Sequence, residues 1–87
     1  MVIAAGLVLK IGTTDWLFII GCSMLVLVLE LINTAIEHLC DTVTKDFHPS
    51  IKIIKDASAA AVLLSAAGSV ITGIIIFFPK LLALLKL

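Results

Sequence analysis

Four polar residues, Glu30, Asn33, Glu37 and Asp41, stand at the end of a long apolar run in this chain. Their offsets of 0, 3, 7 and 11 place them on one face of an α-helix, within an arc of about 80°. A carboxylate in apolar surroundings is costly unless it is hydrated, paired or protonated. Three carboxylates and an amide on one stripe therefore indicate a site of binding or chemistry.

The three carboxylates differ in depth along this helix. Counted from Thr14, Glu30 lies about 24 Å along it, near the far edge of a hydrocarbon core of about 30 Å. A carboxylate there is a candidate general base, and the alternative is a structural carboxyl bonded to a neighbouring helix. Glu37 and Asp41 project further and offer the oxygen ligands that Mg²⁺ accepts, and the alternative is a solvated helix end. A bound cation would offset the unfavourable helix dipole at this end.

Lys55 and Asp56 lie across a short polar segment, where a second apolar run begins. A lysine near the first turn of a helix is unfavourable for the protein alone, but with free backbone N–H groups it suits a phosphate. Asp56 is either an N-cap-like residue or a second cation ligand. Asn33 can donate and accept hydrogen bonds within the stripe. These residues predict a cation- and phosphate-binding site at the membrane–water boundary, where a phosphate donor would meet a lipid head group.

The composition is that of an all-α integral membrane protein. The 87 residues are 62% hydrophobic, whereas soluble domains are about 45–50% apolar. The net charge of zero implies no bulk attraction to nucleic acid. Cys22 and Cys40 match no metal-binding spacing and are interpreted as reduced thiols. His38 and His48 match no zinc pattern and are interpreted as polar groups of a helix end and a loop.

We expect a single membrane domain whose elements are two full transmembrane helices and part of a third. Residues 1–12 are too short to cross a bilayer, and are either re-entrant or the second half of a first span. Residues 14–43 form a long transmembrane helix with Thr13 or Thr14 as its N-cap and an interfacial aromatic at Trp16.

The second half of the chain is expected to form a loop, a helix and a tail. Residues 44–51 are the loop, residues 52–78 the last transmembrane helix, and residues 79–87 an interfacial tail that begins where Pro79 ends the helix. Small residues recur at every fourth position of this helix: Ala57, Ala61, Ser65, Ser69 and Gly73. They form a face suited to close helix packing in lipid, or reflect chance in an alanine-rich helix.

The polar motifs closely resemble the small bacterial diacylglycerol kinase and undecaprenol kinase family over nearly the whole chain. The matching residues are Glu30-Leu-Ile-Asn33-Thr34-Ala35-Ile36-Glu37, Asp41, Asp46-Phe47-His48-Pro49 and Lys55-Asp56 with the Ala57-Ser58-Ala59-Ala60-Ala61-Val62-Leu63 that follows. The Phe-His-Pro form of the loop is more similar to the Gram-positive undecaprenol kinase branch.

The resemblance implies a homotrimer of three-span subunits that transfers the γ-phosphoryl group of MgATP to a lipid hydroxyl, at active sites shared between subunits. By position, it implies Glu30 as the catalytic base and Glu37 as a metal ligand. It places Asn33, Lys55 and Asp56 at the nucleotide and phosphate, with Asp41 and His48 close by. The family's surface helix and the first half of its first span, which supply another acidic metal ligand, have no counterpart in this sequence.

The positive-inside rule gives no membrane orientation, because three lysines lie on each side of the membrane. The expected function predicts the orientation instead. ATP is cytosolic, so residues 44–51 should face the cytoplasm of a bacterium, with the protein in its plasma membrane. Two other classes use the same residues. A small cation transporter would spread carboxylates through the membrane depth, whereas here they cluster at one edge. A structural subunit would be held by its small-residue face and would need no chemistry at Lys55 and Asp56.

Overall fold

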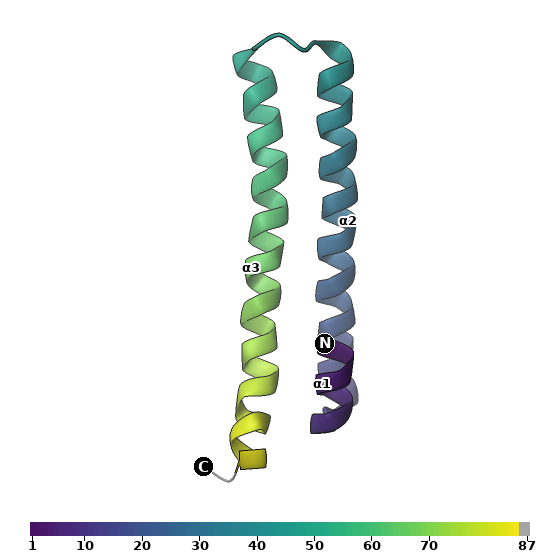
Figure 1. Cartoon of the computed structure of the whole chain (residues 1–87), viewed down its shortest axis with the longest axis vertical. Helices are drawn as coiled ribbons and strands as arrows, with labels where there is room; N and C mark the ends of the chain where they lie inside the picture. The colour runs from purple at the N-terminus through teal and green to yellow at the C-terminus, as the bar shows by residue number, and fades with distance from the viewer. Residues whose placement is uncertain (86–87) are drawn as a thin grey trace.

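Three helices form the part of the chain that the computed structural model describes, residues 1–85. They are α1 (Val2–Leu9), α2 (Thr13–Val43) and α3 (Pro49–Leu85), and these residues contain no strand. α2 and α3 make a long antiparallel hairpin that residues 44–48 join at one end, and α1 lies beside it at the other (Figure 1). We call these the loop end and the α1 end.

The hairpin is longer than a bilayer is thick and its surface is apolar. The molecule measures 58 × 20 × 18 Å, against a hydrocarbon core of about 30 Å. α2 and α3 are each long and apolar enough to cross a membrane, and most of their large apolar side chains are exposed. Such a surface needs lipid or further protein around it. This architecture agrees with the all-helical membrane fold expected from composition.

α2 and α3 meet along a seam of buried and half-buried residues spaced alternately four and three positions apart, as in a coiled coil, except that the last step on α3, from Ile76 to Lys80, is again four. On α2 the seam consists of Asp15, Ile19, Cys22, Val26, Leu29, Asn33, Ile36 and Cys40. On α3 it consists of Ile51, Lys55, Ser58, Val62, Ser65, Ser69, Thr72, Ile76 and Lys80. The α3 side of the seam is rich in small residues, so the two backbones can approach closely. Of the predicted small-residue face, Ser65, Ser69 and Gly73 are half-buried, whereas Ala57 and Ala61 remain exposed.

The α1 end carries a small apolar core. Ile11, Ile19 and Ile76 are buried there, and Leu9, Trp16 and Phe77 pack against them. Gly6 of α1 is also buried, because its Cα faces the indole ring of Trp16. A Cβ atom at Gly6 would lie 2.6 Å from Cη2 of Trp16. The position therefore requires glycine for close approach rather than for an unusual backbone conformation.

Replacing Gly6 with alanine is expected to destabilise the α1 end, because the added methyl group overlaps the Trp16 ring. Overpacking of this kind costs about 1–3 kcal/mol. The measurement is thermal unfolding in detergent, followed through the fluorescence of Trp16. Gly21→Ala is the matched control, because nothing lies within 4 Å of a Cβ atom there. A Gly6→Ala protein as stable as Gly21→Ala would contradict this packing.

The ends of the long helices differ from those expected from sequence. Gly12, not Thr13 or Thr14, is the N-cap of α2. α3 begins at Pro49 rather than at residue 52, because proline is well suited to a first helical position. Asp56 therefore lies in the second turn of α3 and is not an N-cap, and the linking loop shortens to residues 44–48.

The prediction that Pro79 ends the last helix is wrong. α3 continues through Pro79 to Leu85, so the segment predicted as a tail is helical as far as the structure describes it. Residues 86 and 87 of that segment lie outside the described residues. Proline in a helix removes one backbone hydrogen bond, but neighbouring contacts can hold the helix together around it.

Candidate functional site

The predicted site residues gather toward the loop end of the hairpin. There Lys55 of α3 reaches across to Asp41 of α2, and Lys55 Nζ donates a hydrogen bond to Asp41 Oδ1 at 2.6 Å. Lys55 stands in the seam and its side chain is 35% exposed, whereas that of Asp41 is 55% exposed. The structure therefore brings together two residues that are 14 positions apart in sequence, as a site on facing helices requires.

Both members of this pair oppose the dipole of their own helix. Asp41 lies in the last turn of α2, where partial negative charge from free carbonyl groups disfavours a carboxylate. Lys55 lies in the second turn of α3, near the end that favours an anion. Each side chain partly neutralises the other. A phosphate close to Lys55 and a cation close to Asp41 would satisfy both helix ends at once.

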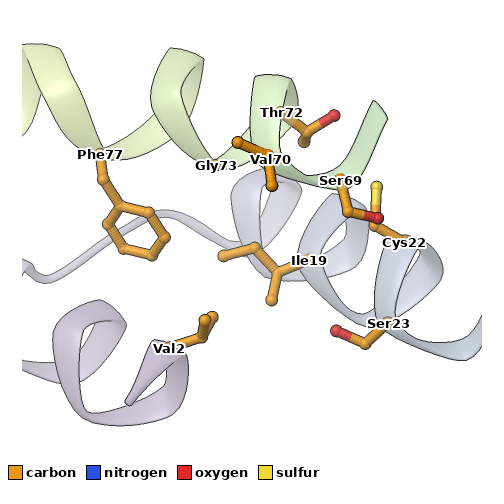
Figure 2. A pocket seen from close by; sticks show the side chains of 9 residues that line it. All are labelled: Val2, Ile19, Cys22, Ser23, Ser69, Val70, Thr72, Gly73 and Phe77. Atoms are coloured by element: carbon orange, nitrogen blue, oxygen red, sulfur yellow. The ribbon is translucent and has the colours of Figure 1, made fainter. Parts of the chain in front are cut away.

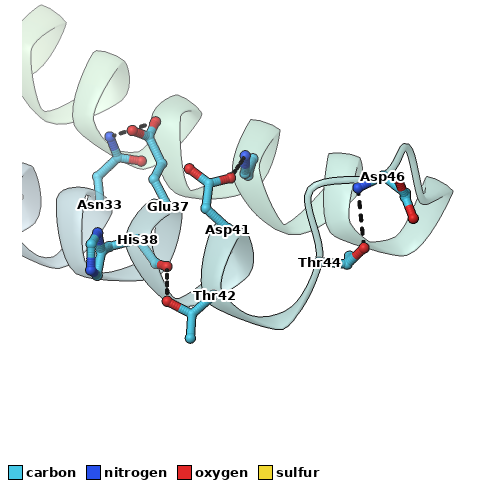
Figure 3. Close-up of polar contacts among 8 residues, drawn as sticks. Asn33, Glu37, His38, Asp41, Thr42, Thr44 and Asp46 are labelled. Atoms are coloured by element: carbon cyan, nitrogen blue, oxygen red, sulfur yellow. Dashed lines mark hydrogen bonds and ion pairs between the residues drawn. The ribbon is translucent and has the colours of Figure 1, made fainter.

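Glu37 and Asn33 form a second contact, one turn further into the hairpin. Asn33 Nδ2 donates to Glu37 Oε1 at 3.4 Å (Figure 3). Asn33 belongs to the seam, and its Oδ1 atom is buried without a hydrogen-bond partner in the described part of the chain. Glu37 is exposed on the flank of the seam. The amide therefore orients the carboxylate that sequence predicts as a metal ligand.

Glu30 is exposed two turns before Glu37 and contacts neither Lys55 nor Asp56. Its neighbour Thr34 donates its hydroxyl to the Glu30 backbone carbonyl at 3.0 Å, so this threonine bonds the backbone and not the carboxylate. Glu30 and Glu37 each directly follow a seam residue, Leu29 and Ile36. They consequently point along one flank of the hairpin, where lipid or another helix would lie.

Asp56 is separated from the Asp41–Lys55 pair. It accepts a hydrogen bond from Lys52 Nζ at 2.5 Å, one turn earlier on α3. Both side chains are more than 60% exposed, at 61% and 64%. An ion pair so accessible to water holds its partners weakly. Asp56 is therefore available to a ligand at little cost.

A hollow of about 450 Å³ lies beneath the loop and connects several of these groups. Its lining includes Lys55 and Asp56 together with Lys45, Asp46, Phe47, His48, Ile51 and Lys52. Phe47 is 79% exposed, which is unusual for a large apolar side chain at the water side of a membrane protein. Sequence reasoning placed Lys55, Asp56 and His48 at or near the site, but it assigned no such place to Lys45, Phe47 or Lys52. An aromatic residue among lysines in a short polar loop was the signal for them.

The loop itself is locally ordered by side-chain hydrogen bonds. The backbone N–H of Asp46 donates to Thr44 Oγ1 at 3.1 Å (Figure 3). The N–H of Ser50 donates to His48 Nδ1 at 3.2 Å, so His48 caps the first turn of α3. This agrees with its interpretation as a polar group of the loop.

The donor set fits a metal ion that arrives with phosphates better than a resident metal. Within residues 1–85, no three His, Cys, Asp or Glu side chains come together as a metal cage. Mg²⁺ is commonly held by one or two carboxylates and the phosphates of a substrate. Glu37 supplies one exposed carboxylate of this type, and Asp41 is close to the same end but paired with Lys55.

A second hollow, of about 290 Å³, lies between α1, α2 and α3 near the α1 end (Figure 2). Its lining includes Ile19, Cys22, Ser69 and Phe77, and it contains no charged side chain. It is distant from the polar stripe along both long helices. Such a hollow suits an apolar occupant and supplies no group for acid–base chemistry.

Comparisons with known proteins match this sequence to one family. Residues 1–77 match the family described as prokaryotic diacylglycerol kinase. The undecaprenol kinase of Bacillus subtilis is 41% identical over 80 residues, which cover 92% of this chain and 65% of that protein. The diacylglycerol kinase of Synechocystis is 48% identical over 64 residues, covering 72% of this chain and 37% of that protein. The chain thus spans less than two thirds of the length of either relative. No solved structure matches significantly.

Proposed function

The chain belongs to the prokaryotic diacylglycerol kinase family, and from that membership and its geometry we propose that it phosphorylates a membrane lipid with MgATP. The acceptor is the hydroxyl group of undecaprenol or diacylglycerol. The observation that carries the proposal is the Asp41–Lys55 pair beside the loop-end hollow. It offers a cation for phosphate and a carboxylate within one water-accessible place.

The positions of these residues along α2 support one role for Glu30 and another for Glu37 and Asp41. From Trp16, Glu30 lies about 21 Å and Asp41 about 38 Å along the helix. With Trp16 at one interface, Glu30 is inside the opposite edge of a hydrocarbon core of about 30 Å and Asp41 is beyond it. A lipid hydroxyl would therefore meet Glu30, and a nucleotide would meet Glu37, Asp41 and Lys55.

The nucleotide would occupy the hollow beneath the loop. Phe47 provides an aromatic face for the base, because stacking on such a ring is favourable for any base. Lys55 would exchange Asp41 for a phosphate oxygen, which also suits the start of α3. Asn33 holds Glu37, and Asp56 stands in the same hollow as a second polar contact. Mg²⁺, bound through Glu37 and the phosphates, would neutralise charge on the transferred group.

Glu30 would act as the general base. It accepts the proton of the lipid hydroxyl while that oxygen bonds to the γ-phosphorus and the bond to the departing ADP breaks. Glu30 and Lys55 are not in contact within one chain. This supports an active site shared between copies of the chain, in which the flank carrying Glu30 and Glu37 faces the nucleotide side of another copy. That the assembly is a homotrimer is part of the proposal. The loop end would face the bacterial cytoplasm, where ATP is found.

A direct test is phosphorylation of lipids by the protein in vesicles supplied with γ-labelled ATP and Mg²⁺. We expect label in undecaprenol or diacylglycerol, and none without an added acceptor. Running both acceptors side by side identifies the lipid. ATP-independent flux of divalent cations into the same vesicles, with no labelled lipid, would favour the transport alternative and overturn the kinase.

A further inference from the structure

Only two side-chain contacts between polar groups link α2 to α3 in residues 1–85, and they lie at opposite ends of the hairpin. The first is Asp41–Lys55 at the loop end, with 2.6 Å between Oδ1 and Nζ. The second is Asp15–Lys80 at the α1 end, with 3.7 Å between Oδ2 and Nζ. The hydroxyl groups of Ser65, Ser69 and Thr72, which stand in the seam between them, donate to carbonyl groups of α3 itself.

The registers of the two contacts agree to within one residue. The residue numbers of the pairs add to 96 at the loop end and 95 at the α1 end. The stretch between the pairs is 26 residues on α2 and 25 on α3. The seam between them is uncharged, consists largely of apolar or small residues and repeats every seven residues, so it distinguishes weakly between neighbouring registers. Besides the short loop of residues 44–48, the charged pairs are therefore features that can specify how far α2 is advanced along α3.

The two pairs stand in different relations to their helices. Asp15 is in the first turn of α2, so its charge agrees with the helix dipole, and Lys80 lies five residues before Leu85 on α3, where the dipole neither favours nor opposes it strongly. Asp41 and Lys55 oppose theirs. The side chains of Asp15 and Lys80 are 31% and 36% exposed, so that Asp15 is less exposed than Asp41 while the two lysines are alike. The helix dipoles therefore favour exchange of Asp41 and Lys55 for ligands, and they give no such drive at the α1 end.

We propose that Asp15 and Lys80 are positioning residues: their ion pair fixes the axial register of α2 on α3 and so holds Glu30 and Glu37 at fixed heights relative to Lys55 and Asp56. This role rests on the proposed kinase function. When a nucleotide separates Lys55 from Asp41, the pair at the α1 end is the remaining charged link between the helices. It keeps them from sliding while the loop end is occupied.

The continuation of α3 beyond Pro79 is what places Lys80 in this pair. A helix that ended at Pro79 would leave Lys80 without a defined position. In the structure Lys80 continues the seam, four residues after buried Ile76, and faces the first turn of α2. The continued helix thus delivers the cation to Asp15.

The test uses pulsed electron paramagnetic resonance (EPR) on the whole chain in lipid bilayers, with nitroxides on cysteines replacing exposed Ala35 and Ala59 and with Cys22→Ala and Cys40→Ala in the background. We expect Asp15→Asn and Lys80→Met to broaden or shift the distance distribution by about one helical turn, near 5 Å. They should also lower kcat about tenfold while the KM for ATP changes little. Lys80→Arg should preserve both, and the double exchange Asp15→Lys/Lys80→Asp should restore most of the original distance.

Lys10→Asn is the matched control, because it removes a charge at the same end of the hairpin from a lysine without an ion pair in the described residues. It should leave distance and kcat unchanged. Unchanged distances in both Asp15→Asn and Lys80→Met overturn the proposal, as does a shifted distance with unaltered kcat. If the unaltered protein phosphorylates no lipid, the proposed function fails, and the distances still decide whether the pair sets the register.

Discussion

Replacing Glu30 with glutamine is expected to lower kcat for lipid phosphorylation by about 10²- to 10⁴-fold, the range typical for loss of a general base. Glutamine keeps the size and exposure of the side chain but cannot accept the proton of the lipid hydroxyl. The KM for ATP should change little, because Glu30 lies about 10 Å from Glu37 along the helix and the nucleotide lies beyond it. The measurement is steady-state transfer of labelled phosphate in vesicles.

Two further variants isolate the carboxylate. Glu30→Asp retains the base on a shorter side chain and should keep part of the activity. Thr34→Val alters the adjacent exposed position, whose hydroxyl bonds only the backbone, and should keep nearly all of it. A Glu30→Gln protein within twofold of the unaltered one would remove Glu30 from the reaction.

Replacing Lys55 with methionine is expected to lower kcat/KM for ATP by about 10- to 100-fold. A charge-assisted hydrogen bond to phosphate is worth about 1.5–3 kcal/mol, which corresponds to this range. Methionine preserves the apolar stem of the side chain in the seam, so the hairpin should persist. The loss should appear chiefly in the KM for ATP, and saturation with nucleotide should recover part of the rate.

Lys52→Met provides the graded comparison for this loss. Lys52 lines the same hollow but is 61% exposed and paired within its own helix. Water screens its charge more strongly, so its removal should have a smaller effect than that of Lys55. Equal losses in the two variants would show that the hollow acts through its total charge and that the position of Lys55 is not special.

Local patterns in the sequence were sufficient to predict the helices but not their ends. Long apolar runs define α2 and α3, because a membrane helix satisfies its own backbone hydrogen bonds. α3 continues past Pro79, and Lys80 comes within 3.7 Å of Asp15, a residue 65 positions away. No local signal around Pro79 contains that information. The start of α3 at Pro49 was accessible, because proline favours the first position of a helix.

The candidate site was predicted as one stripe, and the structure divides it. Asn33 enters the seam, whereas Glu30 and Glu37 remain on its flank. An arc drawn on an isolated helix cannot separate these positions, because the separation depends on which face a second helix covers. The contact between Asp41 and Lys55 likewise depends on how the loop folds the two helices together. Phe47 was seen in the sequence only as part of a motif, since its exposure is a property of the folded loop.

The length of the hairpin has a mechanical consequence. The molecule is 58 Å long, whereas the hydrocarbon core of a bilayer is about 30 Å thick, so the helices extend past the membrane–water boundary. Each residue of α2 adds about 1.5 Å along this direction. If Trp16 stays at its own interface, a bilayer thicker by about 3 Å moves the opposite boundary by about two residues along α2, while the hairpin keeps its structure. Counted from Trp16, Glu30 lies about 9 Å inside that boundary. The thickness of the surrounding bilayer therefore determines how far the carboxylate of Glu30 lies from water.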